Sequence, residues 1–330
     1  MSVDPNAPAD PESGLFGLES GPEGARVHVL PVPFDATASY RKGAAGGPEA
    51  ILRASHQVDL CDVVTGNPWR EGIWMAPIEA EVEEWNSAAT RAAEAGDVDT
   101  VNRFGERLNT WVEERTEAAL RSGKLVATLG GDHSVPLGAI AAHARRFPGL
   151  GILHFDAHAD LRRAYEGFTY SHASILHNVL ERTDGVGPLV QVGVRDLCDE
   201  ELDAIRSSDR IHTVFDHDWA AARIVGGNVL ELIRDALSSL PKEVYVTFDV
   251  DGLDPTLCPG TGTPVPGGLS WHEAMLWLGA LVGSGRRIVG FDLTEVAPRG
   301  VPAGEDGWDA IVGARLLYRL IGFALQSAGA

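Results

Sequence analysis

The sequence predicts an α/β fold, a single domain built on an open, mostly parallel, doubly wound sheet. Three observations predict it. Short apolar runs alternate with longer amphipathic ones along the chain of 330 residues, as in a succession of strand–helix units. The apolar runs are near-continuous Val, Ile, Leu and Phe, which is typical of strands covered on both faces. No linker divides the chain, and no repeat recurs at about 20 to 50 residues.

The apolar runs give the expected strands in order. A closed eight-stranded barrel is an alternative, but the number and uneven spacing of the runs fit it less well. The expected strands are 27–32, 125–130, 151–156, 189–194, 210–215, 244–250 and 287–296.

Helical patterns fill the intervals between these strands. In the first of them, Val101, Phe104 and Leu108 share one helix face. Pro136 fits a first helical turn, and Ser270 with Glu273 forms a capping-box pattern. An acidic, Ala-rich segment, 78–99, is expected as a surface insertion or an exposed helix without an assigned function. The expected helices are 99–122, 134–147, 171–182, 199–207, 228–240, 270–282 and 309–326.

Composition excludes several classes of protein. Hydrophobic residues make up 44% and charged ones 22% of the chain, close to a globular average, which argues against wholesale disorder. No apolar stretch is long enough to span a membrane. The net charge of −20, from 27 basic and 47 acidic residues, argues against nucleic-acid and anionic-membrane partners. It would attract a cationic ligand, although an acidic balance also simply aids solubility.

The chain start and the cysteines indicate the compartment. Residues 1–24 are acidic and rich in Pro and Gly, so we expect a flexible arm rather than a signal peptide, followed by one domain over 25–330. Only Cys61, Cys198 and Cys258 are present, without metal-type spacing. This sparse, odd set favours a reducing, cytoplasmic environment.

Acidic and imidazole side chains directly follow four of the expected strands. Because the carboxyl ends of parallel strands share one edge of a sheet, these side chains should meet in one crevice. The four segments are Gly-Gly-Asp-His-Ser at 130–134, Asp-Ala-His-Ala-Asp at 156–160, Phe-Asp-Val-Asp-Gly-Leu-Asp-Pro at 248–255, and Glu295 with Val296.

The spacing within these segments predicts a metal centre. Asp156 and His158 are two residues apart on an extended segment and can point the same way, and Asp249 and Asp251 repeat the arrangement. Several carboxylates in one cleft need compensating positive charge, and the motifs contain no lysine. Two divalent cations would supply it, with Mn²⁺ favoured and Zn²⁺, Co²⁺ or Ni²⁺ also possible. The six candidate ligands are His133, Asp156, His158, Asp160, Asp249 and Asp251.

Simpler interpretations exist for each motif alone. Gly130 and Gly131 could form an anion-binding turn, although no P-loop lysine follows. Asp132 or Ser134 could cap a helix. The Asp-x-Asp-Gly-Leu-Asp run superficially suggests a calcium loop but lacks the spaced terminal Glu. Taken together, the segments are far more specific than any one of them.

These residues resemble the ureohydrolase family of arginase, agmatinase and their relatives. The resemblance covers roughly 26–328, with weaker support from Asp35-Ala36-Thr37, from Ser39, Arg41 and Gly43, and from the loop 259–264. It implies the three-layer α/β/α arginase-deacetylase fold and two manganese ions per subunit. It also implies a homo-oligomer, a trimer or a hexamer.

The same resemblance implies roles for individual residues. One ion would be held by His133, Asp156, Asp160 and Asp249, and the other by Asp156, His158, Asp249 and Asp251. In the family a bridging hydroxide attacks the guanidinium carbon. Asp160 would orient that hydroxide, His172 would shuttle protons at the mouth, and Glu295 would grip the guanidinium.

Elementary chemistry supports these roles independently. A guanidinium carbon is a poor electrophile that requires hydroxide, and a planar carboxylate can position the group by paired, charge-assisted hydrogen bonds. The leaving amine needs a proton, which suits a histidine. His172 could instead be an exposed residue at a helix start, where Ser171 is a possible cap. His154 and the other histidines are expected to be surface or core residues.

Substrate choice rests on the mouth segment 160–172. Arginases carry Asn where Arg162 stands, and the patterns at 165–167 and 170–174 resemble the agmatinase branch. The resemblance implies hydrolysis of agmatine to putrescine and urea, a step of polyamine biosynthesis. Glu166 would bind the distal ammonium or be a solvated surface residue, whereas Arg162 and Arg163 would favour a carboxylate-bearing substrate such as guanidinobutyrate, arginine or formiminoglutamate.

Two further classes of function remain as alternatives. A metal-dependent deacetylase or amidase on the same fold would release no urea and would not need Glu295. A non-catalytic relative should have lost ligands, and all six positions keep theirs.

Overall fold

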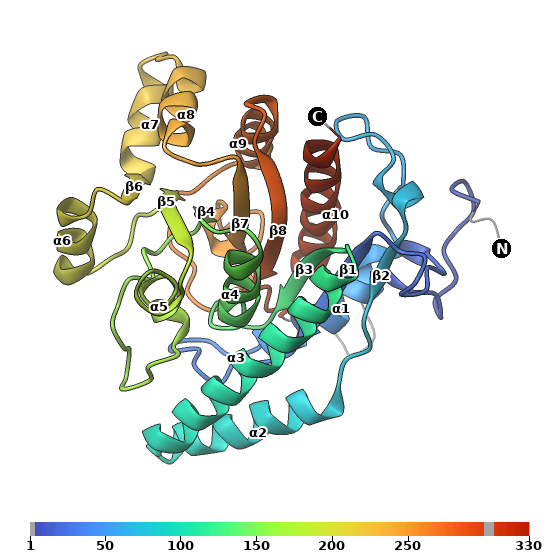
Figure 1. Ribbon diagram of the computed structural model, residues 1–330, viewed down its shortest axis with the longest axis horizontal. Coiled ribbons are helices and arrows are strands. Elements are labelled where there is room, and N and C mark those ends of the chain that lie inside the picture. The colour runs from blue at the N-terminus through green and yellow to red at the C-terminus, as the bar shows by residue number, and fades with distance from the viewer. Residues whose placement is uncertain (1–3, 300–306, 330) are drawn as a thin grey trace.

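An eight-stranded sheet forms the centre of the computed structural model, which describes residues 4–299 and 307–329 (Figure 1). Every strand pair in this sheet is parallel. The strands in spatial order are β2 (Ile73–Met75), β1 (Val27–Val32), β3 (Leu125–Gly130), β8 (Arg287–Thr294), β7 (Glu243–Asp249), β4 (Leu150–Phe155), β5 (Val186–Val192) and β6 (Ile211–Val214).

Helices cover both faces of this sheet. On one face α1 packs on α10, α10 on α9, α9 on α8 and α8 on α7; on the other, α2 packs on α3, α3 on α4 and α4 on α5. The three-layer α/β/α prediction is confirmed, and the barrel alternative is wrong because the sheet ends at β2 and β6. The helices are α1 (Gly47–Ser55), α2 (Ala80–Glu94), α3 (Val98–Arg121), α4 (Leu137–Arg146), α5 (Ile175–Arg182), α6 (Asp199–Ser207), α7 (Asp216–Ile224), α8 (Val229–Ser238), α9 (Trp271–Gly283) and α10 (Trp308–Ala328).

No helix within the described ranges 4–299 and 307–329 is both long enough and apolar enough to span a bilayer.

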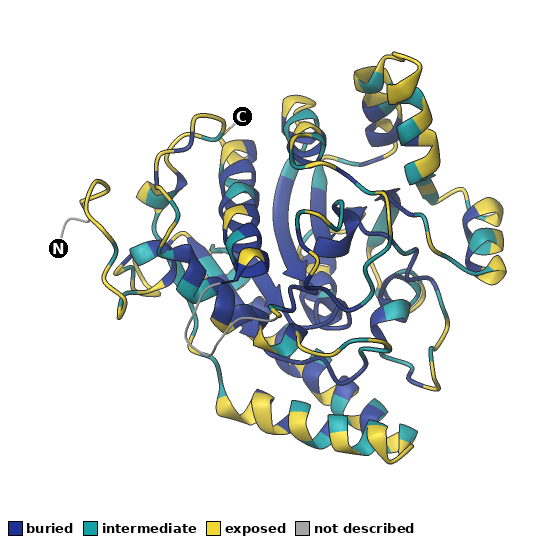
Figure 2. Cartoon of the chain, turned by 180° about the vertical axis from the view of Figure 1, so that it is seen from behind, coloured by how far each residue is buried: buried dark blue, intermediate teal, exposed yellow. Residues whose placement is uncertain are grey.

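The sequence did not predict three of the observed elements, which are the strand β2 and the helices α1 and α7. Strand β2 has only three residues, too few for an apolar pattern to stand out. Helix α1 begins in Gly46-Gly47-Pro48, a sequence typical of a turn, and α7 begins in polar residues. The acidic segment 78–99 contains α2, which lies along α3 and is exposed along much of its length (Figure 2).

Two helices begin later than predicted, and the difference creates the site. Helix α4 starts at Leu137 rather than at Ser134, and α5 starts at Ile175 rather than at Ser171. Residues 131–136 therefore form a turn beyond β3, and residues 172–174 form a short 3-10 helix. Both turns place polar side chains at the carboxyl edge of the sheet.

Part of the expected flexible arm is packed on the core. Leu15, Phe16 and Leu18 are between 1% and 3% exposed and belong to the same apolar cluster as α1 and α10. The Phe16 ring lies 4.8 Å, centre to centre, from the ring of Tyr318. At least residues 15–18 are therefore docked, because their apolar side chains outweigh the acidic, proline-rich surroundings. Residues 1–3 lie outside the described part, and the boundary at residue 24 stays a prediction.

We expect Phe16→Ala to lower the free energy of unfolding by about 3–5 kcal/mol, because it empties a buried aromatic site. Chemical denaturation of the two proteins measures the difference. Glu12→Ala, in the exposed part of the same arm, is the matched control and should change stability by no more than about 0.5 kcal/mol. Equal effects of the two substitutions would contradict the docking of the arm.

Candidate metal centre and active site

Four neighbouring strands end at one crevice. In the sheet β3, β8, β7 and β4 are adjacent, so the segments that follow them meet at its carboxyl edge, as expected for a parallel sheet. The turn after β3 carries His133, β4 leads into Asp156, β7 ends at Asp249, and Glu295 follows β8. The prediction that these four segments share one crevice is confirmed by their contacts.

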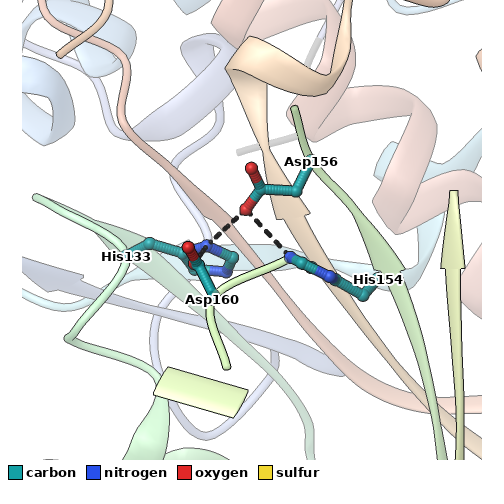
Figure 3. A group of neighbouring side chains, drawn as sticks. All are labelled: His133, His154, Asp156 and Asp160. Carbon is teal, nitrogen blue, oxygen red and sulfur yellow. Dashed lines mark hydrogen bonds and ion pairs between the residues drawn. The ribbon is translucent and has the colours of Figure 1, made fainter. Parts of the chain in front are cut away.

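The first group of side chains surrounds the ring of His133 (Figure 3). Its Nδ1 atom lies 3.0 Å from Asp156 Oδ2 and 3.0 Å from Asp160 Oδ2. Asp249 Oδ2 is 3.5 Å from the same nitrogen. On the other side of Asp156, His154 Nε2 lies 2.9 Å from Oδ2. One imidazole nitrogen and three carboxylates therefore converge on a single point.

The second group shares Asp156 with the first. His158 Nδ1 lies 3.2 Å from Asp156 Oδ1 and 3.2 Å from Asp251 Oδ2. Backbone amides hold the carboxylates in place: His158 N donates to Asp156 Oδ1, and Ala157 N donates to Asp251 Oδ1. Asp249 accepts from the amide of Asp251. All six predicted ligands are thus brought together, with Asp156 between the two groups.

The charge of this cluster fits divalent cations. Burial raises the pKa of Asp249 well above its usual range, and the charges of Asp251 and Asp156 raise it further. Burial and the charge of Asp156 raise the pKa of Asp160 to about 6. Among the described residues, no Lys or Arg forms an ion pair with these carboxylates. Oxygen-rich donors with imidazole suit hard or borderline divalent ions, which would replace the missing positive charge.

The two histidines of the cluster have raised pKa values. Although burial opposes it, hydrogen bonds to Asp156 and Asp160 raise the pKa of His133. The charge of Asp251 and the hydrogen bond to Asp156 do the same for His158 against the effect of burial. A bound metal ion requires neutral imidazoles, so its binding would release these protons.

Two of the predicted catalytic residues have unusual backbone geometry. Asp160 has φ 55° and Glu295 has φ 64°, in the left-handed region that residues other than glycine rarely adopt. Hydrogen bonds stabilise both: the Asp160 carbonyl accepts from the amides of Leu176 and His177, and the Glu295 amide donates to the Gly131 carbonyl. Such conformations cost of order 1–3 kcal/mol each and concentrate at functional sites.

Glu295 has one occupied and one free carboxylate oxygen. Its Oε1 atom accepts from the amide of His133 at 2.9 Å and lies 3.4 Å from His172 Nδ1. Its Oε2 atom is buried and has no hydrogen-bond partner among residues 4–299 and 307–329. A Cβ atom on Gly262 would come within 3.0 Å of this oxygen, so the glycine keeps the space beside it open. Glu295 is not part of the lining of the cavity described below, but it contacts His172, which is.

Further hydrogen bonds place His172 between Glu295 and the mouth. Its Nε2 atom lies 3.1 Å from Ser39 Oγ, and its amide donates to Thr37 Oγ1. Despite burial, which lowers it, the hydrogen bond and charge of Glu295 raise the pKa of His172 to about 9. His172 begins a short 3-10 helix that Ser171 caps, as the alternative interpretation expected, but it is 9% exposed, so the expectation of an exposed residue is wrong.

Asp132 is a structural residue of the same site rather than a ligand. It accepts hydrogen bonds from the amide and hydroxyl of Thr37 and from the amide and hydroxyl of Ser134. Burial and the charge of Glu295 raise its pKa to about 6. Since Thr37 in turn binds the amide of His172, Asp132 anchors the loop that positions this histidine.

A cavity of about 290 Å³ opens onto the cluster. Arg162 lines it, but its Nε atom lies 3.6 Å from the buried carboxylate of Glu201, and its guanidinium covers the ring of Tyr165. Glu166 is exposed and is not part of the lining, so the structure does not bring this predicted substrate residue to the cavity. The cavity is lined by His158, Asp160, His172 and Asp249 and, toward the mouth, by Ser39, Tyr40, Asp196, Leu197, Thr263, Pro264 and Val265.

His154 is the residue of the site that the sequence did not indicate. It was expected in the core or on the surface, and it is fully buried against Asp156. Asp292 and Thr247 were missed as well: His133 Nε2 contacts Thr247 Oγ1 at 2.8 Å, and this hydroxyl donates to Asp292 Oδ1 at 3.0 Å. For His154 and Thr247 the available signal was a polar residue inside an apolar strand, two positions before a predicted ligand.

The sequence of this chain is similar to those of known proteins. The sequence model of the arginase family matches residues 25–322. The N(1)-aminopropylagmatine ureohydrolase of Thermus thermophilus is 36% identical over 316 residues, covering 96% of each chain. The agmatinase of Bacillus anthracis is 33% identical over 87% of this chain and 89% of its own.

Solved structures agree with the sequence relatives. A crystal structure described as a hypothetical agmatinase from Burkholderia thailandensis superposes with a TM-score of 0.71 at 27% identity. The superposition covers 96% of this chain and 92% of that one. The layers and the sheet are therefore those of a known fold.

We expect Asp156→Asn to weaken Mn²⁺ binding by on the order of 100-fold, because the substitution removes the carboxylate that both groups share. Calorimetric titration of the metal-free proteins measures the affinity. Asp196→Asn changes an exposed carboxylate at the mouth of the same cavity and should alter affinity by no more than about threefold. Wild-type affinity in Asp156→Asn would contradict the ligand assignment.

Proposed function

The chain belongs to the arginase family, and we propose that it is a metal-dependent ureohydrolase that cleaves agmatine to putrescine and urea. The related guanidino-amine N(1)-aminopropylagmatine is a second candidate substrate, because relatives that carry this name reach 36% identity. The proposed metal set is two Mn²⁺ ions at His133, Asp156, His158, Asp160, Asp249 and Asp251.

The free oxygen of Glu295 is the observation that carries the proposal. A guanidinium donates parallel N–H bonds to a carboxylate, and a buried, unpaired carboxylate oxygen beside a carboxylate–histidine cluster is the complement of such a group. The absence of a Cβ atom on the neighbouring Gly262 avoids a close contact with this oxygen. An acyl substrate of a deacetylase offers no paired N–H groups to the Oε2 atom, which disfavours that alternative.

The residues around the guanidinium would each have a defined task. Divalent cations bound at this cluster supply hydroxide at neutral pH, which a guanidinium carbon requires. Asp160, fixed by its unusual backbone geometry, accepts a hydrogen bond from the attacking group and orients it. His172 holds a proton on the cavity wall and delivers it to the leaving amine. Ser39 keeps its ring directed toward the mouth.

The mouth of the cavity fits an amine better than a carboxylate. Asp196 is exposed there and has no side-chain partner among the hydrogen bonds and ion pairs of the described residues. The charge of Arg162 is offset by Glu201, so the cation expected to select an acidic substrate is already paired. Leu197 and Val265 line the cavity and can contact the methylene groups of a substrate between its two charged ends.

We also propose a homo-oligomer, a trimer or a hexamer, in the cytoplasm. The family resemblance supports the first and the sparse cysteines support the second.

A substrate panel tests the proposed reaction. After Mn²⁺ loading, we expect urea from agmatine and from N(1)-aminopropylagmatine, and little from arginine, guanidinobutyrate or formiminoglutamate. Glu295→Gln should lower kcat/KM by on the order of 100-fold while the protein keeps its full manganese content, because it loses the charge that pairs with the guanidinium. Colorimetric urea analysis and elemental analysis provide the two readouts.

Three outcomes of the panel would change the assignment. Urea from guanidinobutyrate but not from agmatine would remove the amine from the proposal. Acetate released from acetylated amines without any urea would indicate a deacetylase. Metal loss in Glu295→Gln would make Glu295 a ligand or a structural residue.

We expect Asp196→Asn to raise the KM for agmatine about fivefold with little change in kcat, because an exposed ion pair contributes at most about 1 kcal/mol to binding. Steady-state kinetics separate the two constants. Asp199→Asn, at the exposed start of α6 outside the cavity, is the matched control and should leave KM unchanged. An unchanged KM in Asp196→Asn would place the ammonium elsewhere.

A further inference from the structure

A row of polar side chains, buried except for the half-buried Thr213 at its end, crosses the sheet next to the metal cluster. The strand registers pair Thr128 with Asp292, Asp292 with Thr247, Thr247 with His154, His154 with Gln191, and Gln191 with Thr213. Because side chains alternate along a strand, this row lies on the same face as Asp156 and Asp249, two residues further along. Buried polar residues in the middle of apolar strands require an explanation.

His154 occupies the centre of this row and contacts the cluster through one nitrogen. Its Nε2 atom lies 2.9 Å from Asp156 Oδ2, and its Nδ1 atom lies 3.1 Å from Gln191 Nε2. Distance alone would allow His154 to be a metal ligand, since it groups with His133, Asp156 and Asp160. If Nε2 of His154 carries the ring hydrogen, it can only donate to Asp156 and cannot bind a metal ion. If Nδ1 carries the hydrogen, Nε2 is free to act as a metal ligand.

The amide of Gln191 settles that choice because its orientation is fixed on two sides. Its nitrogen donates to the carbonyl of Ala159 at 2.8 Å, and a carbonyl can only accept. Its oxygen accepts from the hydroxyl of Thr213 at 2.9 Å. The second hydrogen of the amide nitrogen therefore points at His154 Nδ1, which must accept. The ring then carries its hydrogen on Nε2 and donates it to Asp156.

The same row of polar residues also fixes the orientation of His133, but it does so through the ring nitrogen that points away from the cluster. The hydroxyl of Thr247 donates to Asp292 Oδ1, so its oxygen accepts from His133 Nε2. The hydrogen that His133 gives up when a metal ion binds is therefore the one on Nδ1, the nitrogen that faces the cluster. Two histidines with ring centres 5.3 Å apart thus present different atoms to the site, one a ligand nitrogen and the other an N–H donor.

We propose that Gln191 is a positioning residue that locks His154 as an N–H donor to Asp156, so that His154 supports a metal ligand without being one. Outer hydrogen bonds of this kind orient ligands and contribute roughly 10–100-fold to metal affinity. The inference rests on the proposed metal centre, but it needs no substrate and no assumption about the reaction.

Substitution of Gln191 provides the test. Gln191→Met has similar length and no donor, and we expect it to weaken Mn²⁺ binding to the metal-free protein by roughly tenfold or more. Thr213→Val is the matched control: it removes the hydrogen bond on the far side of Gln191 and leaves both donors, so affinity should stay within about threefold. Calorimetric titration gives the affinities, and circular dichroism verifies folding.

Histidine ¹⁵N spectra of the metal-free proteins provide the readout that a merely structural role would not change. In the wild type, the signal that disappears in His154→Asn should show an accepting Nδ1 and an N–H at Nε2. Gln191→Glu keeps the size and the Thr213 contact but cannot donate, so the hydrogen of His154 should move to Nδ1. This second variant also serves if Gln191→Met does not fold.

Wild-type Mn²⁺ affinity in both Gln191 variants would overturn the proposal, as would equal loss in Thr213→Val. A His154 signal unchanged in Gln191→Glu would do the same. Absence of urea release from every guanidino compound would refute the proposed function alone, because affinity and spectra are measured without substrate.

Discussion

The repulsion among buried carboxylates is the constraint on which the rest of this structure depends. Asp156, Asp160, Asp249 and Asp251 are each at most 5% exposed, and no Lys or Arg of the described residues pairs with them. Such a cluster is stable only when cations or protons neutralise it. The amides that bind these carboxylates, the row of polar residues beneath them and the late starts of α4 and α5 all serve to hold like charges together.

The strands of the sheet and the candidate ligands could both be predicted from the sequence, for the same reason. In a parallel sheet the strands are buried on both faces and end at a common edge, so an apolar run followed by Asp or His indicates both a strand and its position relative to the site. The segments after β4 and β7 are of this kind. The element β2 and the helices α1 and α7 lack such a pattern, because they are short or begin in turn-like or polar residues.

Relations across strands could not be predicted in the same way. A histidine within an apolar strand is compatible with an ordinary core position, and the role of His154 depends on Gln191, which is 37 residues away and pairs with it only through the sheet register. The contact of Glu201 with Arg162, at 3.6 Å, likewise joins residues that are far apart in the sequence. The apolar residues Leu15, Phe16 and Leu18 are few and lie within an acidic, proline-rich segment, so the sequence predicts a flexible arm there although these residues are buried.

The left-handed backbone at Asp160 and Glu295 has a consequence for protein engineering. Programmes that raise thermal stability often begin by replacing strained residues with glycine, and a geometric criterion alone would choose these two positions early. Glycine at both positions would relieve the strain of the left-handed backbone but would remove both carboxylates. Selection for heat resistance and selection for turnover therefore act against each other at these positions, and a library built for durability should keep both fixed.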